Sequence, residues 1–172
     1  YSAESGVWSA LWSDLVGQLG TFLDNAKKQS GKKTMVIVSA DHGHITTSKE
    51  KNEHFIEDHP VILSHLQMIP GGEPRMLILY TNEGESSAVI NYVNEHLQDC
   101  FYAVKSQEAL DTGLFGATDN LHPETRQRLG DILLISKGKH YWASKDRELP
   151  FVSYHGGPFP ECLPLRRLAQ TV

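Results

Sequence analysis

The chain has 172 residues, of which 40% are hydrophobic and 22% are charged, a composition typical of a folded globular protein. Its formal net charge is -5 and its lysines and arginines are scattered, which argues against nucleic acid as a bulk partner. No apolar run approaches the roughly 20 residues that span a bilayer, so we expect the covered chain to be soluble. The cysteines, Cys100 and Cys162, are far apart and indicate neither a thiolate zinc site nor a disulfide framework.

Residues 5–29 are predicted to form an amphipathic helix. Apolar side chains recur every three or four positions, with polar ones between them, at Trp8, Leu11, Trp12, Leu15, Val16, Leu19, Phe22 and Leu23. Lys27 and Lys28 fall in the last turn, where cations suit the helix dipole. At this spacing the tryptophans are expected to be core residues that pack on a sheet, rather than a platform for a ligand.

A buried strand is predicted over residues 35–39, directly before Asp41 and His42. It is apolar at successive positions, which is typical of a central strand of an α/β sheet with both faces covered. Ligands of such sheets bind beyond the carboxyl ends of the strands, so Asp41 and His42 stand where a site is expected. A carboxylate beside an imidazole suits zinc, manganese or iron. The alternative is that Asp41 caps the next segment and His42 only packs.

Residues 45–60 are polar and without period, which predicts a loop that leaves the Asp-His turn. The loop contains a second pair, Asp58 and His59. No buried strand precedes this pair, and Pro60 restricts His59 to extended geometry, so we interpret the pair as structural. His65 is expected to be a satisfied core or edge histidine.

Residues 73–145 are predicted to form a small βαβ-type insertion that follows a break rich in proline and glycine. The expected elements are strands over 76–80, 101–104 and 132–136, a helix over 86–97, a short helix at 107–110, a helical turn around Arg126, and a hairpin partner of the last strand at 141–143. Asp131 and Arg128 are expected to be structural. The insertion therefore carries few candidates for chemistry.

A late histidine, His155, precedes two glycines on a loop rich in proline. Backbone geometry, rather than a packed face, would hold such a residue, which is typical of a ligand. The cost of closing a loop rises slowly with its length, so the about 110 residues between the two motifs can be an excursion from one site. We therefore expect the His155 imidazole within several ångströms of the side chains of Asp41 and His42.

Together these motifs resemble the C-terminal part of the alkaline phosphatase superfamily, in its type I phosphodiesterase/nucleotide pyrophosphatase branch. The resemblance rests on Val-Ser-Ala-Asp-His-Gly at residues 38–43, on His-Gly-Gly at residues 155–157, and on the Pro-Glu-x-x-Pro-Leu run that follows. It implies an α/β fold in which helices sandwich an alkaline-phosphatase-like sheet. Residues 1–72 and 146–172 would be part of the metallo-hydrolase core, and residues 73–145 the insertion.

The resemblance also implies hydrolysis of a phosphate ester by two divalent metal ions, zinc first and manganese as the alternative. Asp41 and His42 would bind one ion and His155 the other, whereas His44 would support the site without binding. The implied substrate is a small phosphate ester or a nucleotide. Its identity depends on contacts outside these motifs.

The family also uses an N-terminal aspartate, a threonine or serine nucleophile, and an Asp-x-x-x-His motif, none of which precedes Asp41 here. We therefore expect a C-terminal portion of such an enzyme, with the nucleophile supplied by a missing N-terminal half. By itself it should be inactive and should self-associate through an exposed sheet edge. Two alternatives stay open: part of a phosphoglycerate mutase-like phosphotransferase, and a non-catalytic interaction module. The compartment is unknown, with a slight lean to the cytoplasm.

Overall fold

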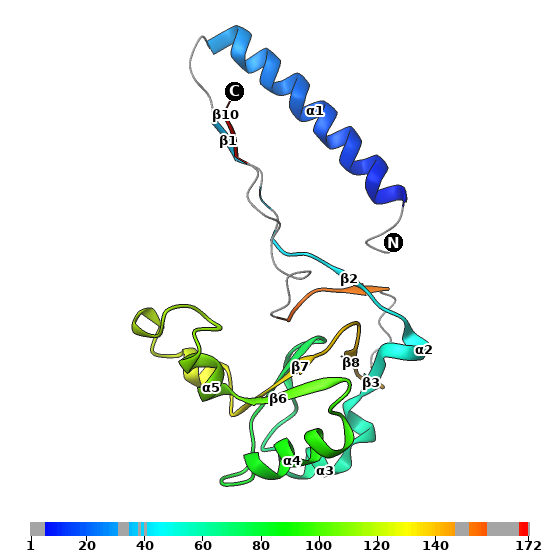
Figure 1. Ribbon diagram of the computed structural model, residues 1–172, viewed down its shortest axis with the longest axis vertical. Coiled ribbons are helices and arrows are strands. Elements are labelled where there is room, and N and C mark those ends of the chain that lie inside the picture. Colours follow the sequence, from blue (N-terminus) through cyan, green and yellow to red (C-terminus); the bar gives the residue numbers. More distant parts are fainter. Residues whose placement is uncertain are drawn as a thin grey trace.

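The computed structural model describes residues 6–30, 35–37, 39, 41–146, 152–157 and 169–171. In chain order the elements are α1 (Gly6–Ser30), β1 (Met35–Ile37), β2 (Ile45–Thr46), α2 (Lys49–Asn52), β3 (Glu53–Phe55), the 3-10 turn η1 (Ile56–Asp58), α3 (Pro60–Ser64), β4 (Gly71–Glu73), β5 (Met76–Leu79), α4 (Ser86–His96), β6 (Phe101–Lys105), α5 (Ser106–Asp111), the 3-10 turn η2 (Thr118–Asn120), α6 (Thr125–Arg128), β7 (Ile132–Ser136), β8 (Tyr141–Ala143), β9 (Ser153–Tyr154) and β10 (Ala169–Thr171). Figure 1 shows α1 apart from the unit that contains β3 to β8.

A four-stranded sheet organises residues 53–143, which we call the packed unit. Its strand order is β4-β5-β7-β6, and β7 is antiparallel to both β5 and β6. Strands β5 and β6 are therefore parallel to one another with β7 between them, and α4 connects them. This is a split βαβ arrangement.

Strand β7 is buried along its whole length, and its alternate residues feed two cores. Ile132 and Leu134 join the apolar residues of α3, α4 and β8, whereas Leu133 and Ile135 join those of α5. This division follows from the two-residue period of a strand, which sends successive side chains to opposite faces. Both faces of the sheet are covered, as the continuous apolar run of β7 requires.

The elements predicted within residues 73–145 are confirmed for β5, α4, β6 and β7, and short helices occur at α5 and α6. The predicted hairpin between β7 and β8 is wrong, because β8 pairs in parallel with β3, with Glu53 opposite Tyr141. The predicted loop over residues 45–60 is also wrong in part, since it contains β2, α2, β3 and η1. Ile56 and Ile62 lie in the same core as the apolar residues of α4. The predicted division into a metallo-hydrolase core and an insertion, with boundaries at residues 72 and 146, stays a prediction.

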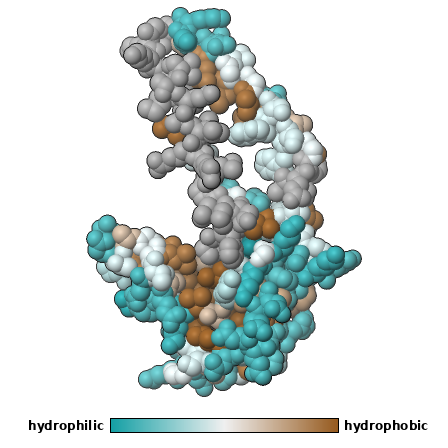
Figure 2. Space-filling view, viewed as in Figure 1, coloured by the Kyte–Doolittle hydropathy of each residue, from teal (hydrophilic) through white to brown (hydrophobic). Residues whose placement is uncertain are grey.

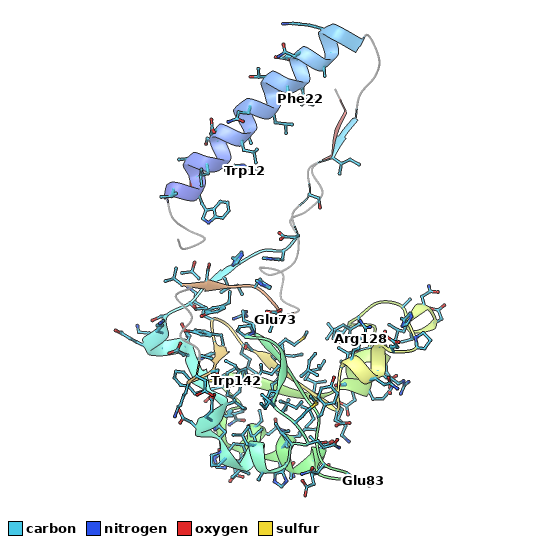
Figure 3. The ribbon with its side chains drawn as sticks, turned by 180° about the vertical axis from the view of Figure 1, so that it is seen from behind. Trp12, Phe22, Glu73, Glu83, Arg128 and Trp142 are labelled. Atoms are coloured by element: carbon cyan, nitrogen blue, oxygen red, sulfur yellow. The ribbon has the colours of Figure 1, made fainter. Side chains whose placement is uncertain are left out.

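The structure differs most from expectation at α1 and β1. Helix α1 forms where predicted, but its apolar face is uncovered: Trp8 is 52% exposed and Phe22 61%. Strand β1 pairs antiparallel with β10 only, and Ile37 is 77% exposed. Figure 2 shows apolar surface along α1, and Figure 3 shows Trp12 and Phe22 far from Trp142 of the packed unit.

The physical reason is the lack of a partner. Among the described residues, no parallel strand lies beside β1, and no sheet covers α1. A central strand and an amphipathic helix need such neighbours to bury their apolar surface. None of the helices in the described part of the chain combines the length and apolar character needed to cross a bilayer.

Candidate metal site

A short antiparallel ribbon brings the two predicted motifs together. Strand β2 pairs with β9, with Ile45 opposite Tyr154 and Thr46 opposite Ser153. The backbone N–H of Thr47 extends this pairing by donating to the carbonyl of Val152 at 3.0 Å. The residues just before β2 therefore lie opposite the residues just after β9, which places the Asp41–His44 turn beside His155.

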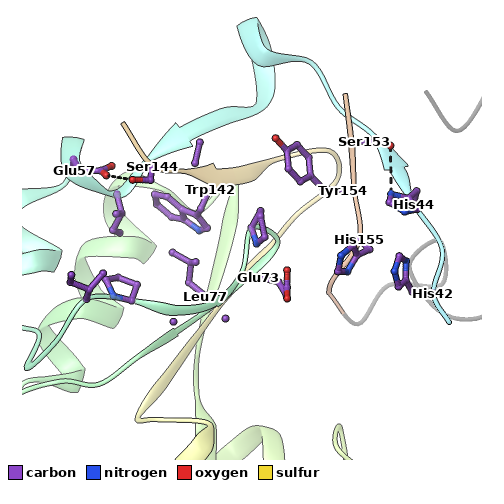
Figure 4. Close-up of a pocket in the computed structure, with 17 residues that line it drawn as sticks. His42, His44, Glu57, Glu73, Leu77, Trp142, Ser144, Ser153, Tyr154 and His155 are labelled. Atoms are coloured by element: carbon purple, nitrogen blue, oxygen red, sulfur yellow. Dashed lines mark hydrogen bonds between the residues drawn. The ribbon is translucent and has the colours of Figure 1, made fainter. Parts of the chain in front are cut away.

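Three imidazole rings meet at this end of the ribbon (Figure 4). The rings of His42 and His155 are stacked with their centroids 4.0 Å apart, and the His44 ring lies 5.0 Å from His42 and 5.7 Å from His155. The predicted approach of His155 to His42 is confirmed. Because stacked rings lie in nearly parallel planes, the in-plane lone pairs of His42 and His155 do not aim at one point.

A backbone contact favours one tautomer of the neutral His42 imidazole. Its Nδ1 lies 3.1 Å from the carbonyl oxygen of Gly43, and a carbonyl can only accept, so Nδ1 carries the hydrogen. In the neutral ring the lone pair is then on Nε2, which lies 3.4 Å from Oδ2 of Asp41. A hydrogen bond to the carbonyl on one nitrogen is how proteins orient histidines that bind a metal through the other.

The ionised form of the Asp41 side chain is stabilised by a backbone hydrogen bond. The backbone N–H of His42 donates to its Oδ1 at 2.9 Å, and this hydrogen bond lowers the pKa of the Asp41 carboxyl. Its second oxygen, Oδ2, is the one that faces Nε2 of His42. Two acceptor atoms 3.4 Å apart leave room for a cation between them.

The 3.4 Å between these two atoms matches the spacing of two zinc ligands. Bond lengths of about 2.0–2.1 Å and a tetrahedral angle place two ligand atoms about 3.3 Å apart. Carboxylate oxygen and imidazole nitrogen are also donors that zinc and manganese accept. Asp41 and His42 thus have the donor set and spacing of a metal-binding pair, with His155 alongside.

Sequence reasoning gave His44 only a supporting role, but its ring is the third member of the group. Partial desolvation lowers the pKa of His44, which favours the neutral ring. Its Nδ1 lies 3.5 Å from Oγ of Ser153, the contact drawn in Figure 4. The signal for His44 was its spacing of two residues from His42, which is the period of one strand face.

Arg75 was missed altogether, although it is fully buried. Its Nε donates to the carbonyl of Gly156 at 3.2 Å, and its terminal nitrogens donate to the carbonyls of His140 at 2.8 Å and Gly138 at 2.9 Å. The guanidinium therefore ties the His155 loop to the turn before β8. The sequence offered no signal beyond a lone cation at the edge of an apolar run.

Gly156 fits this junction because it has no side chain. Its φ of +86° is one that other residues rarely adopt. A Cβ placed on it would come within 3.1 Å of Cβ of Glu73. The glycine after His155 thus allows the loop to approach β4 closely.

A cavity of about 770 Å³ extends from the three histidines along the packed unit (Figure 4). His42, His44 and His155 line one part of it, and residues including Glu73, Leu77, Trp142 and Tyr154 line the rest. Pockets for small molecules range from about 300 to 1,000 Å³. The cavity thus joins polar, metal-suited donors to an apolar and aromatic wall.

The residues that the sequence marked as structural have structural partners. His59 contacts the Tyr92 hydroxyl at 3.2 Å, and Asp58 pairs with Lys145. His65 pairs with Glu85 at 3.1 Å. Asp131 accepts the backbone N–H of Thr81 at 2.8 Å, which ties the end of β5 to the start of β7.

Comparisons with known proteins identify the family and the fold of the chain. The sequence profile of the type I phosphodiesterase/nucleotide pyrophosphatase family matches residues 14–158, whereas no curated protein sequence matches the chain. Among solved structures, murine ectonucleotide pyrophosphatase/phosphodiesterase 5 aligns with a TM-score of 0.67 at 19% identity, and the human protein with 0.66 at 18%. The murine protein has also been solved as an inactive variant in complex with AMP.

Each alignment covers 97% of this chain and 42% of the other, so the chain spans about two fifths of the length of these structures. At such identities the likeness shows the fold, which is mixed α/β. The profile match includes both the Asp41–His42 turn and the His155 loop, and it confirms the resemblance inferred from those motifs. The chain belongs to the type I phosphodiesterase/nucleotide pyrophosphatase family of hydrolases.

Proposed function

We propose that this chain supplies Asp41, His42 and His155 as ligands to the two-metal site of a phosphate-ester hydrolase. The observation that carries the proposal is the pair of acceptors, Oδ2 of Asp41 and Nε2 of His42, 3.4 Å apart beside the stacked ring of His155. The nucleophile would come from the part of the family fold that this chain does not cover.

Asp41, His42 and His155 would have different roles in binding the two ions. Asp41 supplies negative charge, and His42 supplies a nitrogen oriented by the Gly43 carbonyl. His155 lies in a parallel plane, which suits a second ion rather than the first. When bound, two divalent ions lower the pKa of a nucleophilic hydroxyl and stabilise the leaving oxygen. Zinc suits these donors best, with manganese as the alternative.

The proposed substrate is a small phosphate ester of nucleotide size. The cavity of about 770 Å³ begins at the histidines and continues along Trp142 and Tyr154, so a phosphate at the histidines could place an organic group against the aromatic wall. The AMP complex of the inactive murine variant supports this substrate class.

Two alternative functions are a mutase-like phosphotransferase and a non-catalytic interaction module. The profile match favours the phosphodiesterase branch over a mutase-like phosphotransferase. A non-catalytic interaction module would have no need for a carboxylate and an imidazole at the spacing of metal ligands, and metal binding separates it from a hydrolase. A proton on Nε2 of His42 would make the pair with Asp41 an ion pair instead, and metal binding tests that arrangement as well.

The first test is zinc binding by calorimetry, in a Cys100→Ser background that removes the chain's one described thiol. We expect Asp41→Asn and His155→Ala each to weaken zinc binding by at least about 10–100-fold, since even residues that only orient ligands have effects of that size. His65→Ala, which removes a histidine paired with Glu85, is the matched control. Equal affinity in all four proteins would overturn the proposed ligands.

The second test is catalysis. Because the proposal places the nucleophile outside this chain, we expect no turnover of a chromogenic phosphodiester with added zinc or manganese. Turnover that survives repurification and disappears in Asp41→Ala would show that the chain contains its own nucleophile, and would contradict that part of the proposal.

A further inference from the structure

A second group of side chains of the types that bind metals lies within the packed unit. His54 is on β3, Cys100 directly precedes β6, and His140 directly precedes β8. One donor atom from each of these residues lies within 4.8 Å of the other two, and each residue is partly buried. Within the described part of the chain, these are the three histidine, cysteine or acidic side chains whose donor atoms all lie this close to one another.

The backbone around the three residues is fixed by the fold. Parallel pairing aligns His54 with Trp142, two residues after His140. Arg75 holds the carbonyl of His140, and the backbone N–H of Lys137 donates to the carbonyl of Cys100 at 2.8 Å. The three donors are therefore brought together by tertiary structure and not by a flexible loop.

The rings are also held in place. Phe101, which is 1% exposed, meets the ring of His54 edge-on with centroids 4.8 Å apart. Nε2 of His54 lies 3.0 Å from Nδ1 of His140, so the two imidazoles share one hydrogen. The two nitrogens are close enough to share a cation once both rings tilt, because a tetrahedral ion lies off the line that joins them.

We propose that His54, Cys100 and His140 bind one zinc ion at a site separate from Asp41, His42 and His155. Tetrahedral zinc would separate the nitrogens by about 3.3 Å and each nitrogen from the sulfur by about 3.6 Å. The nitrogens must open by a few tenths of an ångström, and rotation of the Cys100 side chain can bring in the sulfur. Because the group is only partly buried, water can take the fourth position.

Zinc binding at this site would release one proton, from the thiol of Cys100. Burial, followed by the charges of His140 and His59, lowers the pKa of His54 to about 4, and burial with the Arg75 cation lowers that of His140, so both rings are neutral. The ring that donates the shared hydrogen moves it to its other nitrogen. The thiol of Cys100, whose pKa is raised by burial and Asp99, loses its proton to solvent as the Zn–S bond forms. No atom is oxidised or reduced.

Such an ion would join β3 to the starts of β6 and β8. The three ligands converge only in the folded chain, so zinc would bind the folded state and raise its stability. This site does not depend on the hydrolase proposal, because it shares no residue with it.

The test is a cobalt(II) titration of the full chain, followed by its near-ultraviolet spectrum. We expect a thiolate-to-cobalt charge-transfer band that saturates at one equivalent and that zinc abolishes by displacement. Cys100→Ser should remove the band. Cys162→Ser is the matched control, since it changes the other cysteine, which lies outside the described residues, and it should leave the band unchanged.

Variants at the two histidine groups separate the sites. His54→Ala or His140→Ala should weaken cobalt binding by more than about 100-fold, which exceeds the usual effect of a residue that only orients a ligand. His42→Ala should leave the charge-transfer band intact. Circular dichroism confirms that each variant is folded, and zinc should raise the melting temperature of the parent chain more than that of Cys100→Ser. Absence of the band in the folded parent, or its loss in Cys162→Ser rather than Cys100→Ser, would overturn the proposal.

Discussion

Leu134 on β7 and Leu15 on α1 are both at positions that the period of their element assigns to a core, yet Leu134 is fully buried and Leu15 is 53% exposed. In the packed unit, the faces of β7 meet α4 on one side and α5 on the other. Helix α1 meets no comparable surface among the described residues. A hydrophobic pattern thus shows which surface needs a partner, but not whether the chain itself supplies that partner.

The largest effect should come from Arg75, which ties the packed unit to the His155 loop. Arg75→Met should lower the free energy of unfolding by about 4 kcal/mol, because it removes three charge-assisted hydrogen bonds, to the carbonyls of Gly138, His140 and Gly156. Chemical denaturation measures this change. Arg128→Met, which removes an exposed partner of Glu124, is the control and should change stability by less than about 0.5 kcal/mol. Equal losses in the two variants would mean that Arg75 is not the tie we infer.

A smaller effect should separate the two leucines. Leu134→Ala should cost about 3 kcal/mol, the usual range for a buried leucine, because it leaves a cavity in the core. Leu15→Ala should stay within about 0.5 kcal/mol, since the side chain is exposed and alanine favours a helix. Urea denaturation of both variants makes the comparison. A loss of several kcal/mol for Leu15→Ala would show that α1 is packed in solution.

Acid should destabilise the packed unit through its partly buried histidines. The pKa of His54 is about 4 in the fold against a usual 6.5, because of burial and the neighbouring His140 and His59. Between these values the unfolded chain binds a proton that the folded chain does not, so stability falls as pH drops from 6.5 to 4 and is level above 6.5. With a chelator present we expect a loss of about 1 kcal/mol, allowing for partial exposure. His54→Phe should flatten this dependence; an unchanged slope would assign the loss to other groups.

The substitution with the smallest expected effect on stability should change self-association instead. The exposed apolar face of α1 is expected to drive self-association, and sedimentation velocity should show a dimer or a larger species. Trp12→Glu, at a residue that is 47% exposed, should shift the distribution to the monomer and leave the unfolding free energy within about 0.5 kcal/mol. A parent chain that stays monomeric over a wide concentration range would contradict this expectation.

Local pattern was sufficient where an element's partners follow closely in the chain. The apolar run 132–136 predicted β7, and the periodic pattern over 86–97 predicted α4. Both elements formed as predicted because the segments that cover them lie within about 70 residues of the same chain. The convergence of His42 and His155 was also predictable, since both motifs sit at turns beside glycines. The profile match and the ribbon of β2 and β9 agree with that inference.

Pattern failed where long-range contacts decide the outcome. The pairing of β8 with β3 is set across almost 90 residues, and the turn before β8 is held by Arg75 rather than by a hairpin signal. The grouping of His54, Cys100 and His140 has the same cause, because each residue lies on or directly before a different strand and none has ligand-like spacing in the sequence. Local spacing cannot reveal donors that only a sheet brings together.

The central claim is that Asp41 and His42 hold a divalent ion beside His155. Zinc-edge anomalous diffraction from crystals of the zinc-soaked chain tests it most directly, because the method locates the ion and identifies the element. We predict a peak about 2.0–2.1 Å from Oδ2 of Asp41 and Nε2 of His42, separate from any peak at Cys100. Zinc only at Cys100, or nowhere, with ordered Asp41 and His42 side chains, would contradict the account.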